Sequence, residues 1–294
     1  MANLKDIRRR ITSVQGTQKI TKAMKMVAAS KLRKAQESIE EVRPYAYSIR
    51  SLIKHLVGES GYVHPLMESR PEVKKVAMVV LTSDRGLCGG FNSNILRHAQ
   101  RFWQENRHKY EDIRILTIGK KAGDFFKHRH IPVAHRFDGV FNDLDFQKAS
   151  DIATVLTDLY QKGEVDAVHI VYNEFKSAVE QKVVDELLIP ITSLDEQERE
   201  GDRDVFRGSG HLYEPGQKEI LTDLVPKHIA TQILRCLLES LASEYGARMT
   251  AMDSATNAAS DMIDRLTLTY NRTRQAVITT EIMEIVGGAE ALGK

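Results

Sequence analysis

The chain has 294 residues, of which 42% are hydrophobic and 28% charged, proportions that are typical of a folded soluble protein with one large or two small domains. No apolar run approaches the roughly 20 residues of a spanning helix, and no apolar core follows the charged N-terminus as in a signal peptide. Cys88 and Cys236 fit no metal or redox spacing, so we expect a reducing, cytoplasmic compartment and membrane association only through partners.

Charge is distributed unevenly although the net charge is only +2. Residues 1–57 carry 13 Lys or Arg against 4 Asp or Glu. Residues 58–217 carry 21 against 26, and residues 218–294 carry 8 against 10. One basic end on a nearly neutral chain indicates a specific acidic partner.

The N-terminal segment, residues 1–57, predicts one very long helix. Apolar or small residues recur at the a and d positions of a heptad from Leu4 to Leu56, which is typical of a helix that pairs with another helix. The heptad match fails in its middle at Gln18, Thr21 and Lys25.

A second apolar stripe appears at this gap. Ile20, Met24 and Val27 follow the i, i+4, i+7 spacing of one helix face, which is not the face of the heptad seam. The sequence therefore predicts an apolar surface that the coiled coil does not use.

The middle of the chain, residues 74–194, has a different periodicity. Short apolar runs alternate with helical patterns, which predicts a parallel sheet with helices on its faces. The expected strands are Val76–Leu81, Ile113–Ile118 and Val165–Tyr172, with a further candidate in Glu180–Ile191; the expected helices are Phe91–Arg107 and Phe146–Gln161. Residues 195–217 are charged and glycine-rich, as in an exposed loop or linker.

The C-terminal segment, residues 218–290, predicts a second long helix. Its apolar and small residues repeat at spacings of 3 and 4 from Leu234 to Val277. Because the globular segment lies between the two long helices, they can pair antiparallel. The expected fold class is α/β, in which a long antiparallel coiled coil carries a central Rossmann-like α/β domain.

The stretch from Thr82 to Asn92 follows a strand and opens a helix, where dinucleotide-binding folds place a glycine-rich turn. Its G-x-x-G-G spacing matches neither G-x-G-x-x-G nor the P-loop. A tight connection that requires glycine is favoured, and a nucleotide-binding enzyme stays open as an alternative.

Catalytic and metal-binding patterns are weak. The ten histidines are scattered except for the pair His128 and His130, and no H-E-x-x-H, cysteine cluster or G-x-S-x-G is present. Asp143 and Asp145 favour a turn and a helix N-cap over acid–base chemistry. We expect no enzyme activity, cofactor or metal in this chain.

The basic residues of the N-terminal helix admit three interpretations: a solvated face, a nucleic-acid contact or an acidic protein partner. Residues 1–44 lack the aromatic side chains that stack on bases, which disfavours nucleic acid. The adjacent apolar stripe favours the protein partner. The basic run consists of Lys19, Lys22, Lys25, Lys31, Arg33 and Lys34.

Three motifs in order along the chain resemble the gamma subunit of F-type ATP synthases. The first is Ile7–Val14 followed by TQKITKAMKMVAASKLRKAQ, the second is SDRGLCGGFN, and the third is the stretch Ala247–Ala289. The resemblance spans the whole chain. Chloroplast members carry a cysteine-paired redox insertion, and residues 195–216 contain no cysteine, so a bacterial type is favoured.

The resemblance implies a rotor without bond chemistry of its own. In that family the terminal helices form a shaft inside a ring of alternating alpha and beta subunits, and the α/β domain lies near the membrane-embedded c ring. The implied partners are the alpha and beta subunits, the epsilon subunit and the c ring, with one copy of this chain per complex and no nucleic acid. The implied location is peripheral, at the cytoplasmic face of the bacterial inner membrane.

Carried over by position, the resemblance also implies contact residues. The expected beta-subunit contacts are Ile20, Lys22, Met24, Lys25 and Val27 on the first helix, Arg274 and Gln275 on the last, and Asp84 and Arg85 in the central loop. Tyr213 and Glu214 resemble the region that meets the c ring and the epsilon subunit.

Overall fold

The computed structural model describes residues 4–192 and 213–292. Two compact units share the long terminal helices: one comprises residues 1–28 and 249–294, and the other comprises residues 29–248. The helices are α1 (Leu4–Ser60), α2 (Phe91–Asn106), α3 (Lys120–His128), α4 (Phe146–Gln161) and α5 (Gln217–Leu292), with short 3-10 turns η1 (Pro65–Met67) and η2 (Val140–Asn142). The strands are β1 (Lys75–Leu81), β2 (Asp112–Ile118), β3 (Val133–Phe137), β4 (Ala167–Phe175) and β5 (Gln181–Ile189).

The larger unit is built on one five-stranded sheet in the order β3-β2-β1-β4-β5. The first four strands are parallel, and β5 pairs antiparallel with β4. Six of the seven residues of β1 are buried, which explains why this central strand is a continuous apolar run. The expected α/β fold with a parallel sheet and long terminal helices is confirmed.

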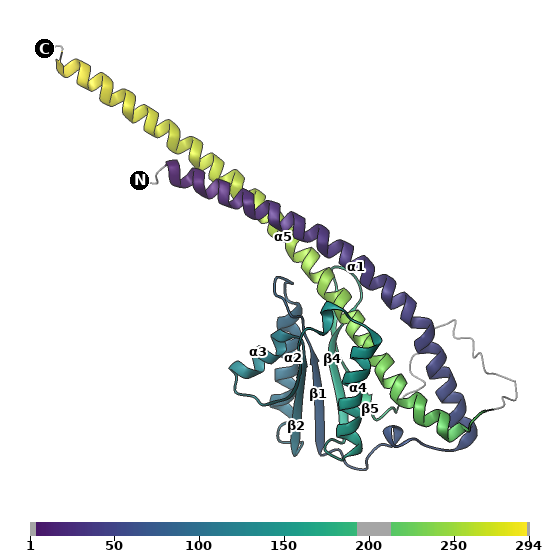
Figure 1. Ribbon diagram of the computed structural model, residues 1–294. Coiled ribbons are helices and arrows are strands. Elements are labelled where there is room, and N and C mark those ends of the chain that lie inside the picture. Colours follow the sequence, from purple (N-terminus) through teal and green to yellow (C-terminus); the bar gives the residue numbers. More distant parts are fainter. Residues whose placement is uncertain (1–3, 193–212, 293–294) are drawn as a thin grey trace. The chain divides into compact units, whose positions relative to one another are not determined.

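Helices cover both faces of the sheet (Figure 1). Alternate residues of β1 point to opposite sides, so Ala77 and Val79 join one core and Met78 and Val80 the other. The first core includes α4 and the parts of α1 and α5 that belong to this unit, and the second includes α2 and α3. The terminal helices are therefore anchored in the globular core.

The expected strands and helices of the middle segment are found within a few residues of their predicted ends, and α4 has the predicted bounds. Sequence patterns missed β3 and α3. In β3 the three central residues are exposed and only its ends are half-buried, so this edge strand has no apolar run to reveal it. Helix α3 has only nine residues, shorter than the window in which helical periodicity is clear.

The terminal helices are longer than expected. Helix α5 begins at Gln217, one residue before the predicted segment, and Pro226 lies inside it. Leu221, Val225 and Ile229 of the same helix are fully buried in the core. Their burial stabilises α5 around Pro226, which has no backbone N–H to donate. The predicted division into segments 1–57, 74–194, 195–217 and 218–290 stays a prediction, and most of the expected linker lies outside the described residues.

In the larger unit α1 and α5 run antiparallel. The ammonium of Lys218, at the start of α5, lies over the ring of Tyr62, just after the end of α1, and the ammonium of Lys31, earlier in α1, lies over the ring of Tyr245, later in α5. Across residues 4–192 and 213–292, no helix has both the length and the apolar content needed to cross a membrane.

Candidate partner-contact surface

The smaller unit is an antiparallel pair of helix ends whose seam contains a polar layer. The hydroxyls of Thr21 and Thr256 lie 2.8 Å apart across the seam, and Thr21 is 8% exposed. The sequence predicted that the heptad seam is interrupted at Thr21, and this prediction is wrong in one respect. The seam continues through the gap, because short hydroxyl side chains bond to each other there instead of packing as hydrocarbons.

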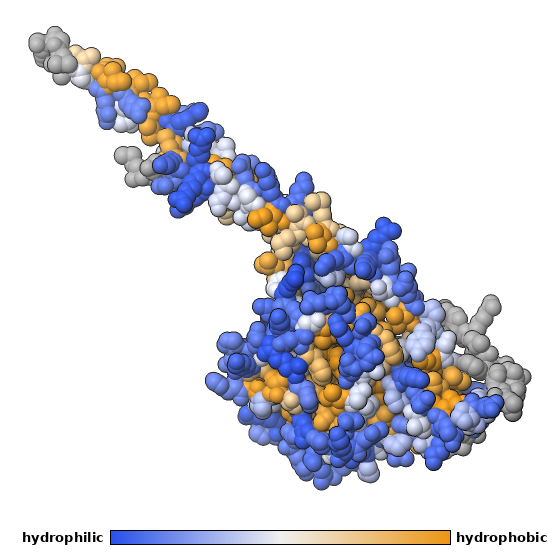
Figure 2. Space-filling view, viewed as in Figure 1, coloured by the Kyte–Doolittle hydropathy of each residue, from blue (hydrophilic) through white to orange (hydrophobic). Residues whose placement is uncertain are grey.

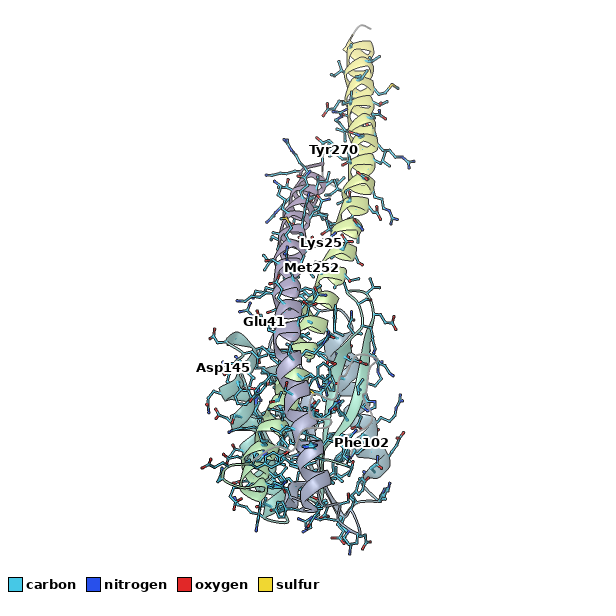
Figure 3. The ribbon with its side chains drawn as sticks, turned by 90° about the vertical axis from the view of Figure 1, so that its right-hand side faces the viewer. Lys25, Glu41, Phe102, Asp145, Met252 and Tyr270 are labelled. Atoms are coloured by element: carbon cyan, nitrogen blue, oxygen red, sulfur yellow. The ribbon has the colours of Figure 1, made fainter. Side chains whose placement is uncertain are left out.

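Lys25 occupies the next seam position. Its Nζ atom lies 2.5 Å from Oδ1 of Asp253, and both side chains are roughly half exposed, at 41% and 48%. Figure 3 shows Lys25 beside Met252, between the two helices. Sequence reasoning assigned Lys25 to the outward surface, whereas the structure places its charge against a carboxylate of the same shaft.

Two of the three residues of the stripe on α1 have the exposure that its spacing predicted. Ile20 and Val27 are 62% and 57% exposed, and Met24 between them is half-buried. Lys22 is exposed as well. Sequence reasoning missed Met26, which is 62% exposed and, at about 100° per residue, lies on the other flank of the helix. Whether these residues contact a beta subunit stays a prediction.

The end of α5 continues past the first residues of α1. The pairing of Thr21 with Thr256 places Leu4 near residue 273, so about the last five turns of α5 have no α1 residue beside them (Figure 1). Arg274 and Gln275 lie at the start of this stretch and are exposed. Figure 2 shows hydrophobic side chains gathered there, and the large exposed ones are Ile278, Ile282, Met283, Ile285 and Val286.

Sequence reasoning missed this apolar end of α5, although a signal was present. Ile278, Ile282 and Ile285 have the same i, i+4, i+7 spacing as the stripe on α1, and they lie off the seam that ends at Val277. Their exposures range from 47% to 72%, far above those of core residues. An exposed apolar face of this kind indicates a surface that a partner covers.

The loop between β1 and α2 is folded around its own side chains. The amide of Asn92 donates to the Ser83 hydroxyl at 2.8 Å, and its oxygen accepts from the Ser83 backbone N–H at 2.9 Å. Its nitrogen also lies 3.2 Å from the sulfur of Cys88. These side chains fill the interior of the turn, where a nucleotide-binding loop would present free backbone donors.

Asp84 and Arg85, expected at a beta contact, have different surroundings. The carboxylate of Asp84 accepts from the backbone N–H of Lys120 at 3.0 Å and of Gly139 at 3.3 Å, so it holds the start of α3. Arg85 is exposed at the loop tip. Asp84 has a structural role that its position after a strand did not reveal, while Arg85 remains free of such a role in the described part of the chain.

A buried ion pair on α5 supports this loop. Arg248 Nη1 lies 2.7 Å from the Glu244 carboxylate, and Arg248 Nη2 donates to the Gly86 carbonyl at 3.3 Å. Burial raises the pKa of Glu244, and the charge of Arg248 opposes that shift. Loop and helix are thus joined by hydrogen bonds inside the larger unit.

The remaining expected residues are dispersed. Tyr213 packs against the core with a half-buried side chain, and Glu214 beside it is exposed. Asp145 is the N-cap of α4, as expected, and accepts from Lys148 N–H at 2.9 Å. His128 ends α3, with Nδ1 2.6 Å from the Asp124 carbonyl. In residues 4–192 and 213–292, no group of three or more His, Cys, Asp or Glu could hold a metal.

Comparison with known proteins assigns the family. The family model described as ATP synthase matches residues 3–292. A chain named ATP synthase gamma chain from Anaeromyxobacter sp. (strain Fw109-5) is 48% identical over 296 residues, covering 99% of this chain and 100% of that one. The chain belongs to the ATP synthase gamma-chain family. The gamma chain of Bdellovibrio bacteriovorus is 46% identical and covers 99% of each.

Solved structures of the family share its fold. A chain of the central stalk and c ring of the Tetrahymena thermophila mitochondrial ATP synthase is 28% identical, with a TM-score of 0.61 over 80% of this chain and 99% of that one. A chain of the Euglena gracilis mitochondrial ATP synthase has a TM-score of 0.66 at 20% identity, covering 98% and 94%. As a member of the gamma-chain family, this chain is a non-catalytic component of the central stalk, the rotor of an ATP synthase.

Proposed function

We propose that the smaller unit is the part of the shaft that turns inside a ring of alternating alpha and beta subunits. The observation that carries this proposal is the exposed apolar surface at the end of α5, where Ile278, Ile282 and Ile285 have none of the described helices beside them. Solvent-exposed apolar area of this extent is unfavourable in an isolated protein, so a surrounding sleeve of partner side chains would stabilise it.

The contact with beta would combine apolar and charged groups. Ile20, Met24 and Val27 offer an apolar stripe, and Lys22 adds positive charge on another side of the helix, about 160° from Met24 around the axis. Arg274 and Gln275 would form a second contact with beta, and Asp84 and Arg85 a third. Lys25 would act there together with Asp253, because the carboxylate at 2.5 Å neutralises much of its field.

Coupling follows from the asymmetry of this surface. The seam, the stripe and the apolar end of α5 make each side of the shaft chemically different. A beta subunit that meets one side is stabilised in one of its open or closed states by that side's contact energy, and rotation changes which side it meets. Such a mechanism needs a single copy of this chain per complex, because a second shaft would present a different side to the same beta subunit.

The residues just before α5 would connect the shaft to the membrane sector. Tyr213 and Glu214 precede α5 and would face the c ring and the epsilon subunit. The Tetrahymena relative belongs to an assembly titled central stalk and c ring, which supports this placement. The curated relatives come from bacteria, which supports a peripheral position at the cytoplasmic face of the inner membrane.

Reconstitution tests the proposal. Complexes are assembled in proteoliposomes with and without this chain, and ATP hydrolysis and proton pumping are measured together. We expect pumping to require the chain while residual hydrolysis persists without it. Pumping at the same ratio of protons to ATP in its absence would contradict the rotor role.

A further inference from the structure

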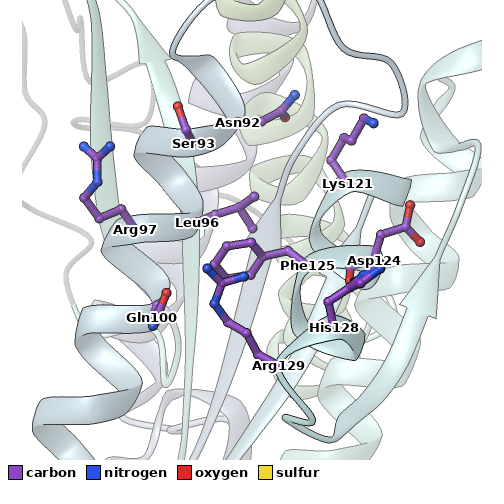
Figure 4. Close-up of a pocket in the computed structure, with 10 residues that line it drawn as sticks. All are labelled: Asn92, Ser93, Leu96, Arg97, Gln100, Lys121, Asp124, Phe125, His128 and Arg129. Carbon is purple, nitrogen blue, oxygen red and sulfur yellow. Dashed lines mark hydrogen bonds between the residues drawn. The ribbon is translucent and has the colours of Figure 1, made fainter.

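A groove between α2 and α3 lies on the face of the sheet opposite α4 (Figure 4). Its volume is about 610 Å³. The floor is apolar: Leu96 of α2 is almost fully buried, and Phe125 of α3 is half-buried. None of the residues expected at the shaft contacts lines this groove.

Three cations line the groove without an acidic partner. Arg97, Lys121 and Arg129 form no ion pair with any residue that the structure describes, and all three are exposed. The guanidinium of Arg129 instead lies 3.6 Å above the ring of Phe125. The one carboxylate of the lining, Asp124, is bound by Arg136 Nη2 at 3.0 Å, so it does not neutralise them.

The spacing of the cations determines which ligand they suit. Lys121 and Arg129 lie eight residues apart on and just after α3, which corresponds to about 12 Å along the helix axis. With Arg97 on the other helix, α2, the cations are spread along and across the groove, so a ligand that extends through it can contact all three. An extended or helical polypeptide presents carboxylates at such intervals and can place an apolar side chain between them.

We propose that this groove docks an acidic segment of another polypeptide, with an apolar side chain against Leu96 and Phe125 and carboxylates paired with Lys121, Arg129 and Arg97. The apolar floor would supply affinity, and the cations would set orientation and specificity. This docking surface lies on the globular unit, so it goes beyond the shaft function and does not depend on it.

Cross-linking in the assembled complex tests the proposal. The photoreactive residue p-benzoylphenylalanine replaces Gln100, which lines the groove, and the product is mapped by mass spectrometry after irradiation. We expect a link to a polypeptide segment that carries several carboxylates. The same residue at Lys127, which is exposed on α3 but outside the lining, should not give that product.

Matched charge reversals sharpen the result. The double variant Lys121→Glu/Arg129→Glu should lower the cross-link yield about tenfold, because two attractive contacts become repulsive. The variant Lys120→Glu/Lys127→Glu changes the same number of charges on the same helix outside the groove and should leave the yield unchanged. Thermal unfolding verifies that both variants fold.

Every other outcome overturns the proposal. These outcomes are no product at Gln100, a product with lipid or nucleic acid, a segment without carboxylates, or equal yields from the two charge-reversal variants. Loss of the product on addition of inorganic phosphate alone would assign the groove to a small anion instead. Any of these would leave the rotor function unaffected.

Discussion

The ammonium of Lys25 lies 2.5 Å from the carboxylate of Asp253, and the two residues come from opposite ends of the chain. The pair sits one turn from the hydrogen-bonded hydroxyls of Thr21 and Thr256. Polar groups in an otherwise apolar or small-residue seam fix how two helices align, because a shift of the helices leaves them without partners. The polar layer therefore sets the register of the shaft.

The ion pair predicts a measurable coupling of modest size. Lys25→Glu or Asp253→Lys alone should destabilise the helix pair, and the double exchange Lys25→Glu/Asp253→Lys should restore most of the loss. Since both side chains are about half exposed, the coupling free energy should be about 0.2–1 kcal/mol. A double-mutant cycle on thermal unfolding measures it, and additive single effects would show that the pair does not interact.

Met24 predicts a functional effect without a folding effect. In Met24→Lys a charge enters the half-buried stripe between Ile20 and Val27, next to a partner that we propose to be acidic. The extra attraction should hinder sliding of the shaft and lower the protons pumped per ATP, with thermal unfolding unchanged. Met24→Leu keeps an apolar side chain of similar volume and should couple normally. Equal pumping per ATP in the lysine variant and the parent would refute this prediction.

Gly119 predicts a severe folding defect. Its φ is +91°, and a Cβ there would lie 2.1 Å from the Thr82 carbonyl oxygen, at the junction of β1, β2 and α3. Because backbone atoms on both sides are fixed by sheet hydrogen bonds, Gly119→Ala should destabilise the larger unit by about 3 kcal/mol or more.

The matched control is Gly86→Ala, in the same unit, where no atom lies within 4 Å of the added methyl group. It should change the free energy of unfolding by less than about 0.5 kcal/mol. Urea unfolding followed by circular dichroism compares the two, and similar midpoints would contradict the steric argument.

His228 predicts an acid-sensitive core. Burial lowers its pKa from 6.5 to about 4, and the charges of Arg50 and Arg235 add to the shift. Between those pH values the unfolded chain binds a proton that the folded chain does not. Stability should therefore fall as the pH drops from 6.5 towards 4, by about 3 kcal/mol from this group alone.

The variant His228→Gln cannot titrate and isolates that contribution. The pKa of Glu239 and of Glu244 is raised by burial, which favours the folded state in acid, but these groups are the same in both proteins. The urea midpoint of the variant should therefore depend less steeply on pH between 6.5 and 4. Identical slopes for the variant and the parent would exclude His228 as the cause.

The fold was predictable wherever the sequence of one element shows its own apolar run or amphipathic spacing. Strand β1 is buried on both sides and reads as an apolar run, and the amphipathic spacing of α4 predicted its bounds. Strand β3 carries no such signal, because it lies at the sheet edge and buries little. Pro226 lies inside α5 although a proline normally ends or begins a helix, because burial of the neighbouring side chains overrides that preference.

The contact surface was predictable only in part. The spacing of Ile20, Met24 and Val27 showed a face separate from the seam, and the structure exposes Ile20 and Val27 as expected but leaves Met24 half-buried. The pairing of Lys25 with Asp253 depends on the register of two helices whose residues lie 228 positions apart, which local sequence does not encode. The capping role of Asp84 likewise needs Lys120 and Gly139, which only the folded sheet brings near it.

Direct observation of rotation tests the central claim. The catalytic ring is fixed to a surface, a bead is attached to the globular unit through a cysteine in place of exposed Lys127, and ATP is supplied. The rotor account predicts one-directional turning that stops when ATP is exhausted. It also predicts that a chain ending before Arg274, and so lacking the apolar end of α5, turns with less torque. Steady ATP hydrolysis by the assembled complex with a bead that does not turn would contradict the account.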